Sequence, residues 1–162
     1  MLAISDIESK IVTALENYID CPVILSNQTA PSPPYPYISY TITTPVHHVD
    51  GTYCMKDGVY YQSMLQTWSF TSHSDDSRAC QRLGMRIYDF FTRSGRGILN
   101  KIGTAVSSKT DLMNRDNYLT IQYEYRCGMD VTFRLMHQLD VAEGAIEQEI
   151  MRVSMNRKGS SK

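Results

Sequence analysis

The chain contains an unusually long stretch in which apolar and polar residues alternate. From residue 119 to residue 135, every odd-numbered position is apolar and every even-numbered position is polar or glycine. A period of two is typical of a β-strand with one buried and one solvent-exposed face, and most strands run for only about five or six residues. The alternation therefore predicts a strand whose length restricts how the rest of the chain can fold. Its apolar positions are Leu119, Ile121, Tyr123, Tyr125, Cys127, Met129, Val131, Phe133 and Leu135.

The length of this strand conflicts with the size of a compact chain of 162 residues. A flat strand over this stretch would extend about 56 Å, whereas a globule of this size is roughly 39 Å across. Either Gly128 bends or bulges the strand, or part of the strand leaves the subunit and pairs with another chain. We expect Gly128 to mark the point where pairing within the subunit gives way to pairing between subunits, and Gly128→Val to damage assembly.

Composition predicts one globular domain over residues 1–156, followed by a flexible basic tail at residues 157–162. The chain has 16 Lys and Arg against 17 Asp and Glu, so no strong overall charge attracts nucleic acid or a membrane surface. No apolar run approaches the roughly 20 residues of a membrane span, and the start of the chain lacks the basic character of a signal peptide. Four widely spaced cysteines favour free thiols in a reducing compartment.

Two stretches have the apolar spacing of amphipathic helices. The first covers residues 4–18, and the second is a helix that Ser74 caps and that ends at Arg93 and Gly95. The tail from residue 141 fits a helix or a strand, and Gly144 favours the strand.

Between and after these helices, alternation and turn residues predict strands. Helices and antiparallel strands in this order predict an α+β fold, a mainly antiparallel β-sheet with two α-helices packed on one face. The predicted strands cover residues 37–43, 59–71, 102–106 and 119–135, and residues 45–58 are predicted to form a polar loop or a long hairpin tip.

Two histidine-containing stretches have residue types that occur in catalytic or metal sites. The run from Ser72 to Asp76 contains serine, histidine and aspartate, but neighbours in sequence cannot adopt the geometry of a hydrolase triad, and a helix cap explains them. His47 and His48 lie near Asp50 and Cys54, yet their spacing matches no metal-ligand pattern. A solvated or contact-forming loop is favoured, and we expect no metal and no cofactor.

The polar face of the long strand carries charges of both signs. Glu124 and Asp130 alternate there with Arg126 and Arg134. Such a mixture suits ion pairs that set the register between strands better than a catalytic acid and base with separated pKa values. These residues therefore indicate a contact surface, and the sequence as a whole does not predict an enzyme.

Three segments together resemble the phage neck and tail terminator family. They are Tyr35-Pro-Tyr-Ile-Ser-Tyr after a proline-rich connector, Gln66-Thr-Trp-Ser-Phe-Thr-Ser-His-Ser-Asp-Asp leading into a helix that ends Tyr88-Asp-Phe-Phe, and Tyr123-Glu-Tyr-Arg-Cys-Gly-Met-Asp-Val. Their order and spacing carry the resemblance, which extends from about residue 5 to residue 155. Cys127 and Met129 flank Gly128 where an aromatic or aliphatic residue would be expected.

This resemblance implies a tail-terminator-like fold and a structural role in the virion of a tailed bacteriophage. Similar proteins form a hexameric neck or collar ring that closes the tail tube and joins it to the head connector, while DNA passes through the lumen. The implied partners are further copies of the chain, the connector, and tail tube or sheath proteins. Assembly would take place in the host cytoplasm, and the finished protein would lie at the neck of the virion.

A ring of identical subunits needs a contact that closes on itself. We expect the residues of the polar loop and of the long strand's polar face to form it, namely His47, His48, Asp50, Tyr53, Glu124, Arg126, Gly128, Asp130 and Arg134. Two other interpretations remain open. One is a phage adaptor that captures a peptide strand on an exposed sheet edge, and the other is a small hydrolase or metalloenzyme that uses His47, His48 and His73.

Overall fold

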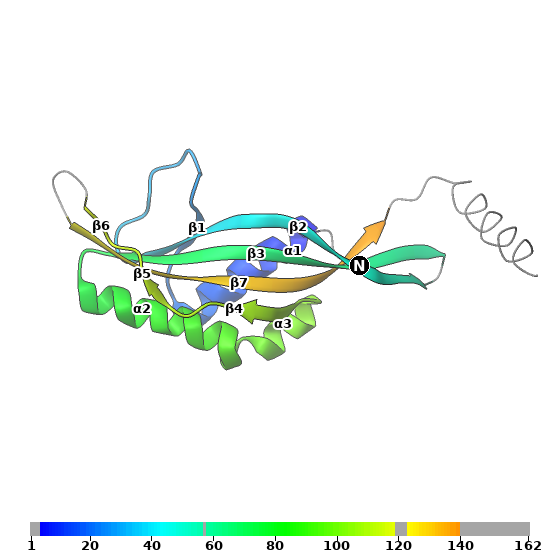
Figure 1. Cartoon of the computed structure of the whole chain (residues 1–162). Coiled ribbons are helices and arrows are strands. Elements are labelled where there is room, and N and C mark those ends of the chain that lie inside the picture. The colour runs from blue at the N-terminus through cyan, green and yellow to red at the C-terminus, as the bar shows by residue number, and fades with distance from the viewer. Residues whose placement is uncertain (1–3, 57, 119–122, 140–162) are drawn as a thin grey trace, which may run out of the picture.

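The computed structural model describes residues 4–56, 58–118 and 123–139, which form one sheet with helices packed against it (Figure 1). The strand order is β1-β2-β3-β7-β4, and β5 and β6 also pair with β7. Every pairing is antiparallel except that of β1 with β2. The α+β prediction is therefore confirmed. The strands are β1 Val23–Leu25, β2 Tyr37–Lys56, β3 Val59–Ser74, β4 Ala105–Lys109, β5 Met113–Asn114, β6 Asn117–Tyr118 and β7 Tyr123–Leu139.

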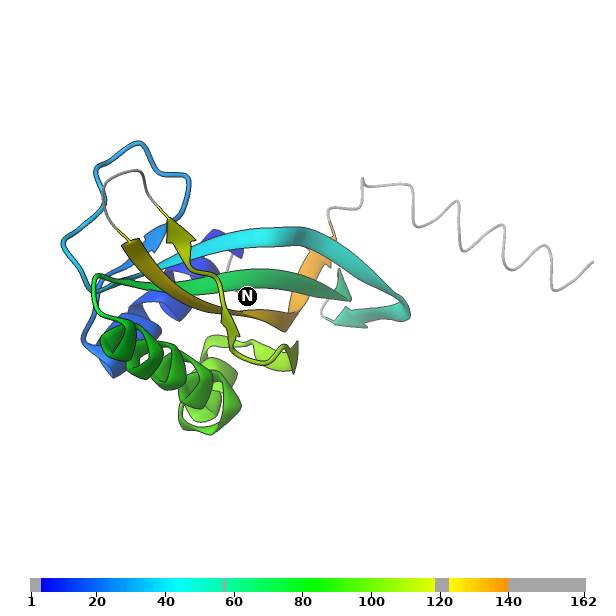
Figure 2. The same ribbon diagram turned by 60° about the vertical axis from the view of Figure 1, so that its left-hand side comes forward.

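The strands β2 and β3 form a long hairpin that extends beyond the helices (Figures 1 and 2). Of the two interpretations of residues 45–58, the hairpin tip is correct, because β2 continues to Lys56 and pairs with Val59. Gly58 has a φ of 78°, a left-handed conformation that glycine adopts without strain and that tight hairpin turns require. We call residues 44–56 and 59–65 the arm.

The strand β7 pairs with β3 without interruption on both sides of Gly128. Their register runs through fifteen consecutive residue pairs, from Tyr60 opposite Leu139 to Ser74 opposite Tyr125. The predicted bulge at Gly128 is therefore wrong, and so is the predicted change there from internal to external pairing. The strand can be longer than a compact globule is wide because the end of the sheet that carries the arm projects past the helices (Figure 1).

One face of the sheet and the helices enclose the hydrophobic core. The alternation places Trp68 and Phe70 of β3 beside Val131 and Met129 of β7, and all four are buried. The helix α1, Ile4–Ile19, adds a stripe of apolar residues spaced three or four apart, as predicted. The buried apolar residues of this helix and of the later helical segments belong to one cluster, so the helices cover the same face of the sheet. These residues are Ile7, Ile11, Leu15, Ile19, Leu83, Ile87, Phe90 and Phe91.

The second helical region differs from its prediction at both ends. Ser74 remains in β3 opposite Tyr125, and Asp76 is the cap of α2, Ser77–Asp89, through a 2.7 Å hydrogen bond from the Ala79 amide. The chain then continues through a π-helical turn, Phe90–Ser94, into a third helix, α3, Arg96–Ile102. With only seven residues, α3 is too short to give a periodic apolar signal, and β4 therefore begins later than predicted.

Other predictions fall partly or wholly outside the described residues. The beginning of the predicted long strand, residues 119–122, lies there, as do the strand predicted after residue 141 and the tail at 157–162. All four cysteines are free thiols, as predicted.

Two glycines near the start of α3 provide a matched test of the packing. A Cβ atom on Gly95 would lie 2.6 Å from the fully buried Phe90 ring, whereas one on Gly97 would meet nothing within 4 Å. We expect Gly95→Ala to lower the free energy of unfolding by about 1–3 kcal/mol through overpacking. Gly97→Ala is expected to raise it by up to about 1 kcal/mol, because alanine favours the helix. Urea denaturation measures both, and equal effects would contradict this packing.

Candidate functional site

The face of the sheet opposite the helices carries a polar network. Ser69, Thr71 and His73 alternate along β3 with core residues, and therefore point away from the helices. On the neighbouring strand, Gly128 lies opposite Thr71 and Arg126 opposite His73. We call this side of the sheet the open face. It collects side chains from β2, β3 and β7 that are far apart in sequence.

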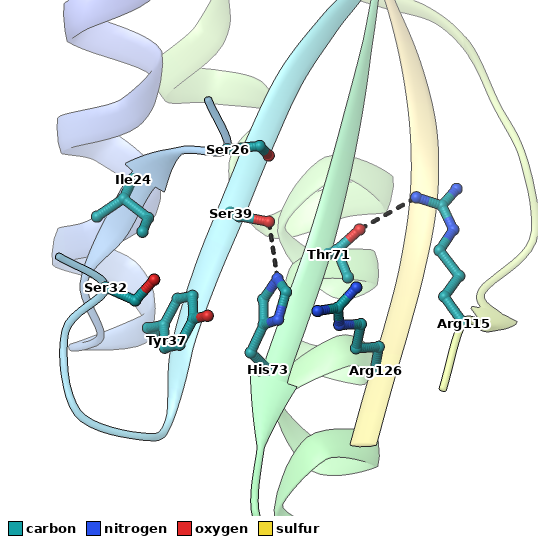
Figure 3. Close-up of a pocket in the computed structure, with 9 residues that line it drawn as sticks. All are labelled: Ile24, Ser26, Ser32, Tyr37, Ser39, Thr71, His73, Arg115 and Arg126. Carbon is teal, nitrogen blue, oxygen red and sulfur yellow. Dashed lines mark hydrogen bonds between the residues drawn. The ribbon is translucent and has the colours of Figure 1, made fainter. Parts of the chain in front are cut away.

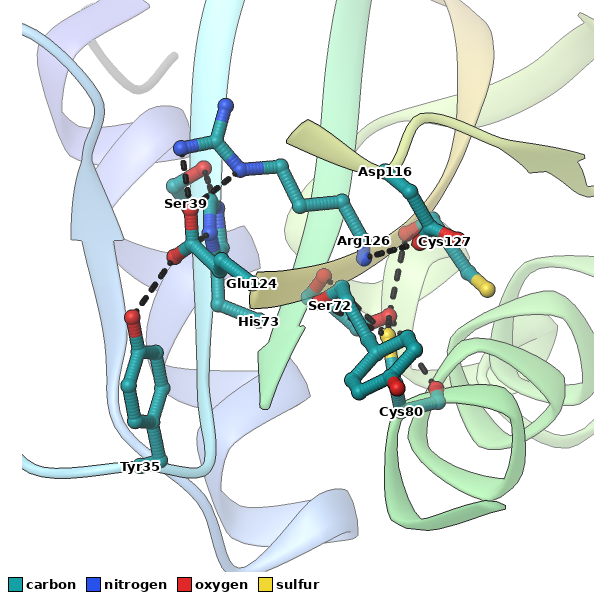
Figure 4. A network of polar contacts seen from close by, with 10 residues as sticks. Tyr35, Ser39, Ser72, His73, Cys80, Asp116, Glu124, Arg126 and Cys127 are labelled. Carbon is teal, nitrogen blue, oxygen red and sulfur yellow. Dashed lines mark hydrogen bonds and ion pairs between the residues drawn. The ribbon is translucent and has the colours of Figure 1, made fainter. Parts of the chain in front are cut away.

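Three buried side chains from three strands form a chain of hydrogen bonds (Figure 4). Ser39 Oγ lies 2.8 Å from His73 Nε2, and His73 Nδ1 lies 2.9 Å from Glu124 Oε1. The exposed fractions are 7% for Ser39, 7% for His73 and 3% for Glu124. Buried polar groups of this kind are costly unless each has a partner, and here each one does.

The protonation states of His73 and Glu124 follow from this environment. Burial lowers the pKa of His73 and outweighs the opposing effect of Glu124, so the imidazole is neutral near pH 7. Burial by itself raises the pKa of Glu124, but the hydrogen bonds from His73 and Arg126 outweigh it and leave that pKa below its ordinary value. A neutral His73 with its proton on Nδ1 donates a hydrogen bond to the Glu124 carboxylate and accepts one from the Ser39 hydroxyl at Nε2.

Glu124 also holds the segment between β1 and β2, residues 26–36, against the open face. We call this segment the connector. The Tyr35 hydroxyl donates a 3.0 Å hydrogen bond to Glu124 Oε1, and Arg126 Nε donates to Oε2 at 2.6 Å. The Tyr35 ring stacks on Tyr37, which in turn stacks on His73 at a centroid distance of 4.5 Å. The network therefore holds the connector, β2, β3 and β7 together.

The order serine, histidine, carboxylate matches that of a hydrolase triad, and here it comes from separate strands. Ser39, however, lies within a strand that pairs with β1 on one side and β3 on the other. Its backbone is therefore part of the sheet and does not form the sharp turn that presents a nucleophilic serine. Glu124 is also shared with Tyr35 and Arg126. This arrangement fits a structural network better than a catalytic one.

A second cluster crosses β7 above Gly128. Arg115, which lies between β5 and β6, donates from Nη2 to Asp130 at 2.8 Å and from Nη1 to Ser69 at 2.6 Å and to Thr71 at 3.1 Å. Burial raises the pKa of Asp130, but hydrogen bonds, above all that from Arg115, outweigh it and leave the pKa low. A Cβ atom on Gly128 would lie 2.7 Å from Arg115 Nη1. A side chain at position 128 would therefore displace the Arg115 guanidinium, which passes directly over the glycine.

The two clusters border a pocket of about 360 Å³ on the open face (Figure 3). Arg115 and Arg126 point toward it from one side, and Ser26 and Ser32 from the other. Ser39, Thr71 and His73 lie between them, so hydroxyl groups and two guanidinium groups dominate the lining.

The predicted contact residues separate into two groups. Glu124, Arg126 and Asp130 join the networks described above, and Gly128 lies beneath Arg115. Arg134 is exposed on β7, where its carbonyl oxygen accepts a hydrogen bond from Thr104. The second group lies on the arm and consists of His47, His48, Asp50 and Tyr53. The arm is at the opposite end of the sheet from β6, the strand that pairs with β7 at Glu124 (Figure 1).

The arm carries exposed apolar side chains as well as these polar residues. Val46, Tyr53 and Met55 are 49%, 60% and 64% exposed. The ring centroids of His48 and His137 lie 6.3 Å apart. Among the described residues, no group of three histidine, cysteine, aspartate or glutamate side chains is placed to hold a metal ion.

A model of the phage neck terminator protein family matches residues 9–156. The chain belongs to the phage neck terminator family. The match covers the open face, the arm and the core apart from Ile7, and it confirms the resemblance to the phage neck and tail terminator family. This neck terminator is therefore a structural protein of the phage neck, a class for which enzymatic activity is not expected. A search of curated proteins finds no match, and no helix in the described part of the chain is long and apolar enough to cross a membrane.

The predicted contact residues do not include Tyr35, Ser39 or Arg115, which lie on the open face of this neck terminator. The sequence grouped His73 with its neighbours in a helix cap, or with His47 and His48 in a hydrolase or metal site, whereas its hydrogen-bond partners are Ser39 and Glu124. The alternation along β3 was the available signal, since it places His73 on the same side as Ser69 and Thr71. The partners come from segments 34 and 51 residues away, and no local pattern identifies those.

The buried His73 is expected to make the stability of this neck terminator depend on pH. Its pKa is lower in the folded chain than the ordinary 6.5, so the unfolded chain binds a proton that the folded chain does not. The free energy of unfolding should therefore fall as the pH decreases from about 7 to about 5. Glu124, whose pKa is lowered from 4.5, contributes stability that is lost only at lower pH.

Urea denaturation at several pH values measures this dependence. We expect His73→Gln to reduce it and His47→Gln, an exposed position on the arm, to preserve it. Equal pH dependence in the wild-type protein and His73→Gln would contradict the assignment of a neutral, buried His73.

A double-mutant cycle tests the close contact between Arg115 and Gly128. Gly128→Val should displace Arg115 from Asp130 and Ser69, and lower the free energy of unfolding by about 1–3 kcal/mol. Once Arg115→Ala has removed the obstructing side chain, adding Gly128→Val should cost little more. Strictly additive effects would show that the valine acts through something other than Arg115.

Proposed function

We propose that this neck terminator forms a hexameric ring that closes the tail tube and joins it to the head connector, while DNA passes through the lumen. The observation that supports the ring is a pair of open strand edges at the arm end of the sheet. Membership of the family supports a role at the virion neck, and assembly in the host cytoplasm is part of the proposal.

The first open edge belongs to β2. Its outer side pairs with β1 only at Ile38, Ser39 and Tyr40, so from Thr41 to Lys56 this side has no strand partner among the described residues. Unpaired backbone amides and carbonyls along an edge are a template for another strand.

The second open edge belongs to β7. Its outer side pairs with β4 as far as Arg134, so the following residues up to Leu139 have no outer partner in the described part of the chain. Both open edges lie at the same end of the sheet and on opposite sides of it. This is the arrangement that a head-to-tail contact between identical subunits requires.

The strand directions determine how such a contact would look. Since β2 and β7 are each antiparallel to β3, they run in the same direction. In a cyclic ring, the β7 edge of one subunit would therefore meet the β2 edge of the next in parallel. The helices of the described residues pack on one face, so they would lie outside the ring and the open face would line it.

The number of strands agrees with a channel. Six copies that each contribute β2, β3 and β7 give a barrel of about 18 strands, a size at which barrels leave an aqueous lumen. With roughly 4.8 Å between strands and a tilt of about 40°, the backbone barrel would be roughly 36 Å wide. Side chains of about 5 Å on each wall leave roughly 26 Å, which is enough for duplex DNA.

The exposed residues of the arm, His47, His48, Asp50 and Tyr53, are the contact residues that this proposal retains. Arg134 is also exposed. Glu124, Arg126 and Asp130 already have charged partners within their own subunit, so they would support the contact indirectly by fixing the sheet.

The alternative is an adaptor that captures a peptide strand of another protein on the β2 edge. The same open edge supports it, but that function requires no closed ring. A pull-down from infected cells separates the two proposals, because a terminator should bring down connector and tail tube proteins.

The ring is tested by particle mass and by substitutions on the arm. Mass photometry of the wild-type protein, alone or with its neck partners, should show particles near 111 kDa, six times the 18.5 kDa subunit. Charged residues on an edge oppose strand pairing, so Val46→Lys with Met55→Lys should reduce this species at least tenfold. Met85→Lys with Ile98→Lys adds the same charge to exposed apolar positions on the helices and should leave it intact.

A wild-type protein that stays monomeric even with its neck partners would refute the ring. Equal loss of particles in both lysine pairs would show that added charge, and not the arm edge, controls assembly.

A further inference from the structure

We propose that the pocket on the open face binds the phosphate group of a small phosphate ester or of a nucleic-acid backbone. Neither the family assignment nor the proposed ring identifies this pocket. It lies within a single subunit, between β1 and the connector on one side and the Arg115 segment and β7 on the other (Figure 3).

Two guanidinium groups converge on the pocket from different elements. Arg126 comes from β7, and Arg115 comes from the segment between β5 and β6. Each guanidinium has five N–H donors in a planar fork, the geometry that matches phosphate oxygens. Arg126 uses Nε and Nη2 on Glu124, and Arg115 uses Nη1 and Nη2 on its serine, threonine and aspartate partners. With the described residues as partners, both forks retain N–H groups for a ligand.

These guanidinium groups are held in place before any ligand arrives. Glu124 is 3% exposed and fixes Arg126, while Asp130 fixes Arg115 through a 2.8 Å ion pair. A donor that is already oriented loses little conformational entropy on binding. The two carboxylates also balance the two guanidinium charges, so binding depends on directed hydrogen bonds more than on a general positive field.

The remaining lining favours a ligand with several acceptor oxygens. Ser32 and Thr71 present hydroxyl groups from opposite sides, and Ser39 and His73, whose protons are used within the network, form a polar floor that is more than nine-tenths buried. Donors on several sides suit a tetrahedral phosphate better than a planar carboxylate with two oxygens. The volume of about 360 Å³ exceeds that of the bare ion and lies within the range of small-molecule sites, so it accommodates a phosphate ester.

The test measures binding to the full chain at constant ionic strength. Isothermal titration calorimetry with inorganic phosphate should give a saturable signal, and acetate should give one at least tenfold weaker. Arg115→Gln should weaken phosphate binding about tenfold or more, since it removes a charge-assisted hydrogen-bond donor. Arg134→Gln, on the open face but outside the pocket lining, should change the affinity less than twofold.

Thermal unfolding of each variant verifies that it is folded. If Arg115→Gln does not fold, Thr71→Val replaces it, because that change keeps the side-chain shape and removes one pocket hydroxyl. Titration with methyl phosphate and with a short DNA duplex then distinguishes a free ester from a backbone phosphate.

Several outcomes would overturn the proposal. They are no saturable binding at millimolar phosphate, equal affinity for acetate, or equal losses in the Arg115 and Arg134 variants. None of these measurements requires a ring, so a failure here is distinguishable from a failure of the hexamer.

Discussion

The uninterrupted pairing of β3 with β7 is the constraint on which the rest of the structure depends. Fifteen consecutive residue pairs fix which side chains of both strands face the helices and which face away. A shift of β7 by one residue along β3 would move Val131 and Met129 out of the core. The hydrophobic core between the sheet and the helices therefore sets the register of the open face as well.

The two faces of the sheet are stabilised by different interactions. The helix face is stabilised by burial of apolar side chains, a non-directional effect that tolerates local variation. The open face depends on directed contacts, in which His73, Glu124 and Arg126 satisfy one another's hydrogen bonds. Such a network has little tolerance for the loss of one member, because each loss leaves a buried polar group without its partner.

The arm connects this architecture to the role of a phage neck protein. A subunit whose sheet ended with its helices would have short, covered edges, whereas this sheet continues past them with exposed backbone on β2 and β7. Monomeric proteins usually protect such edges, since they promote association. The proposed ring gives these edges a partner, and the open face with its pocket would then face the lumen.

The sequence by itself determined which residues face the core, because alternation and helical periodicity are local consequences of backbone geometry. It indicated the first helix, the long strand, the α+β class and the family. Only the tertiary structure decided that Gly128 accommodates Arg115, and that Ser39, His73 and Glu124 meet. Those contacts join segments far apart in sequence, and their positions depend on strand order and register, which pairing between distant strands fixes and no local pattern encodes.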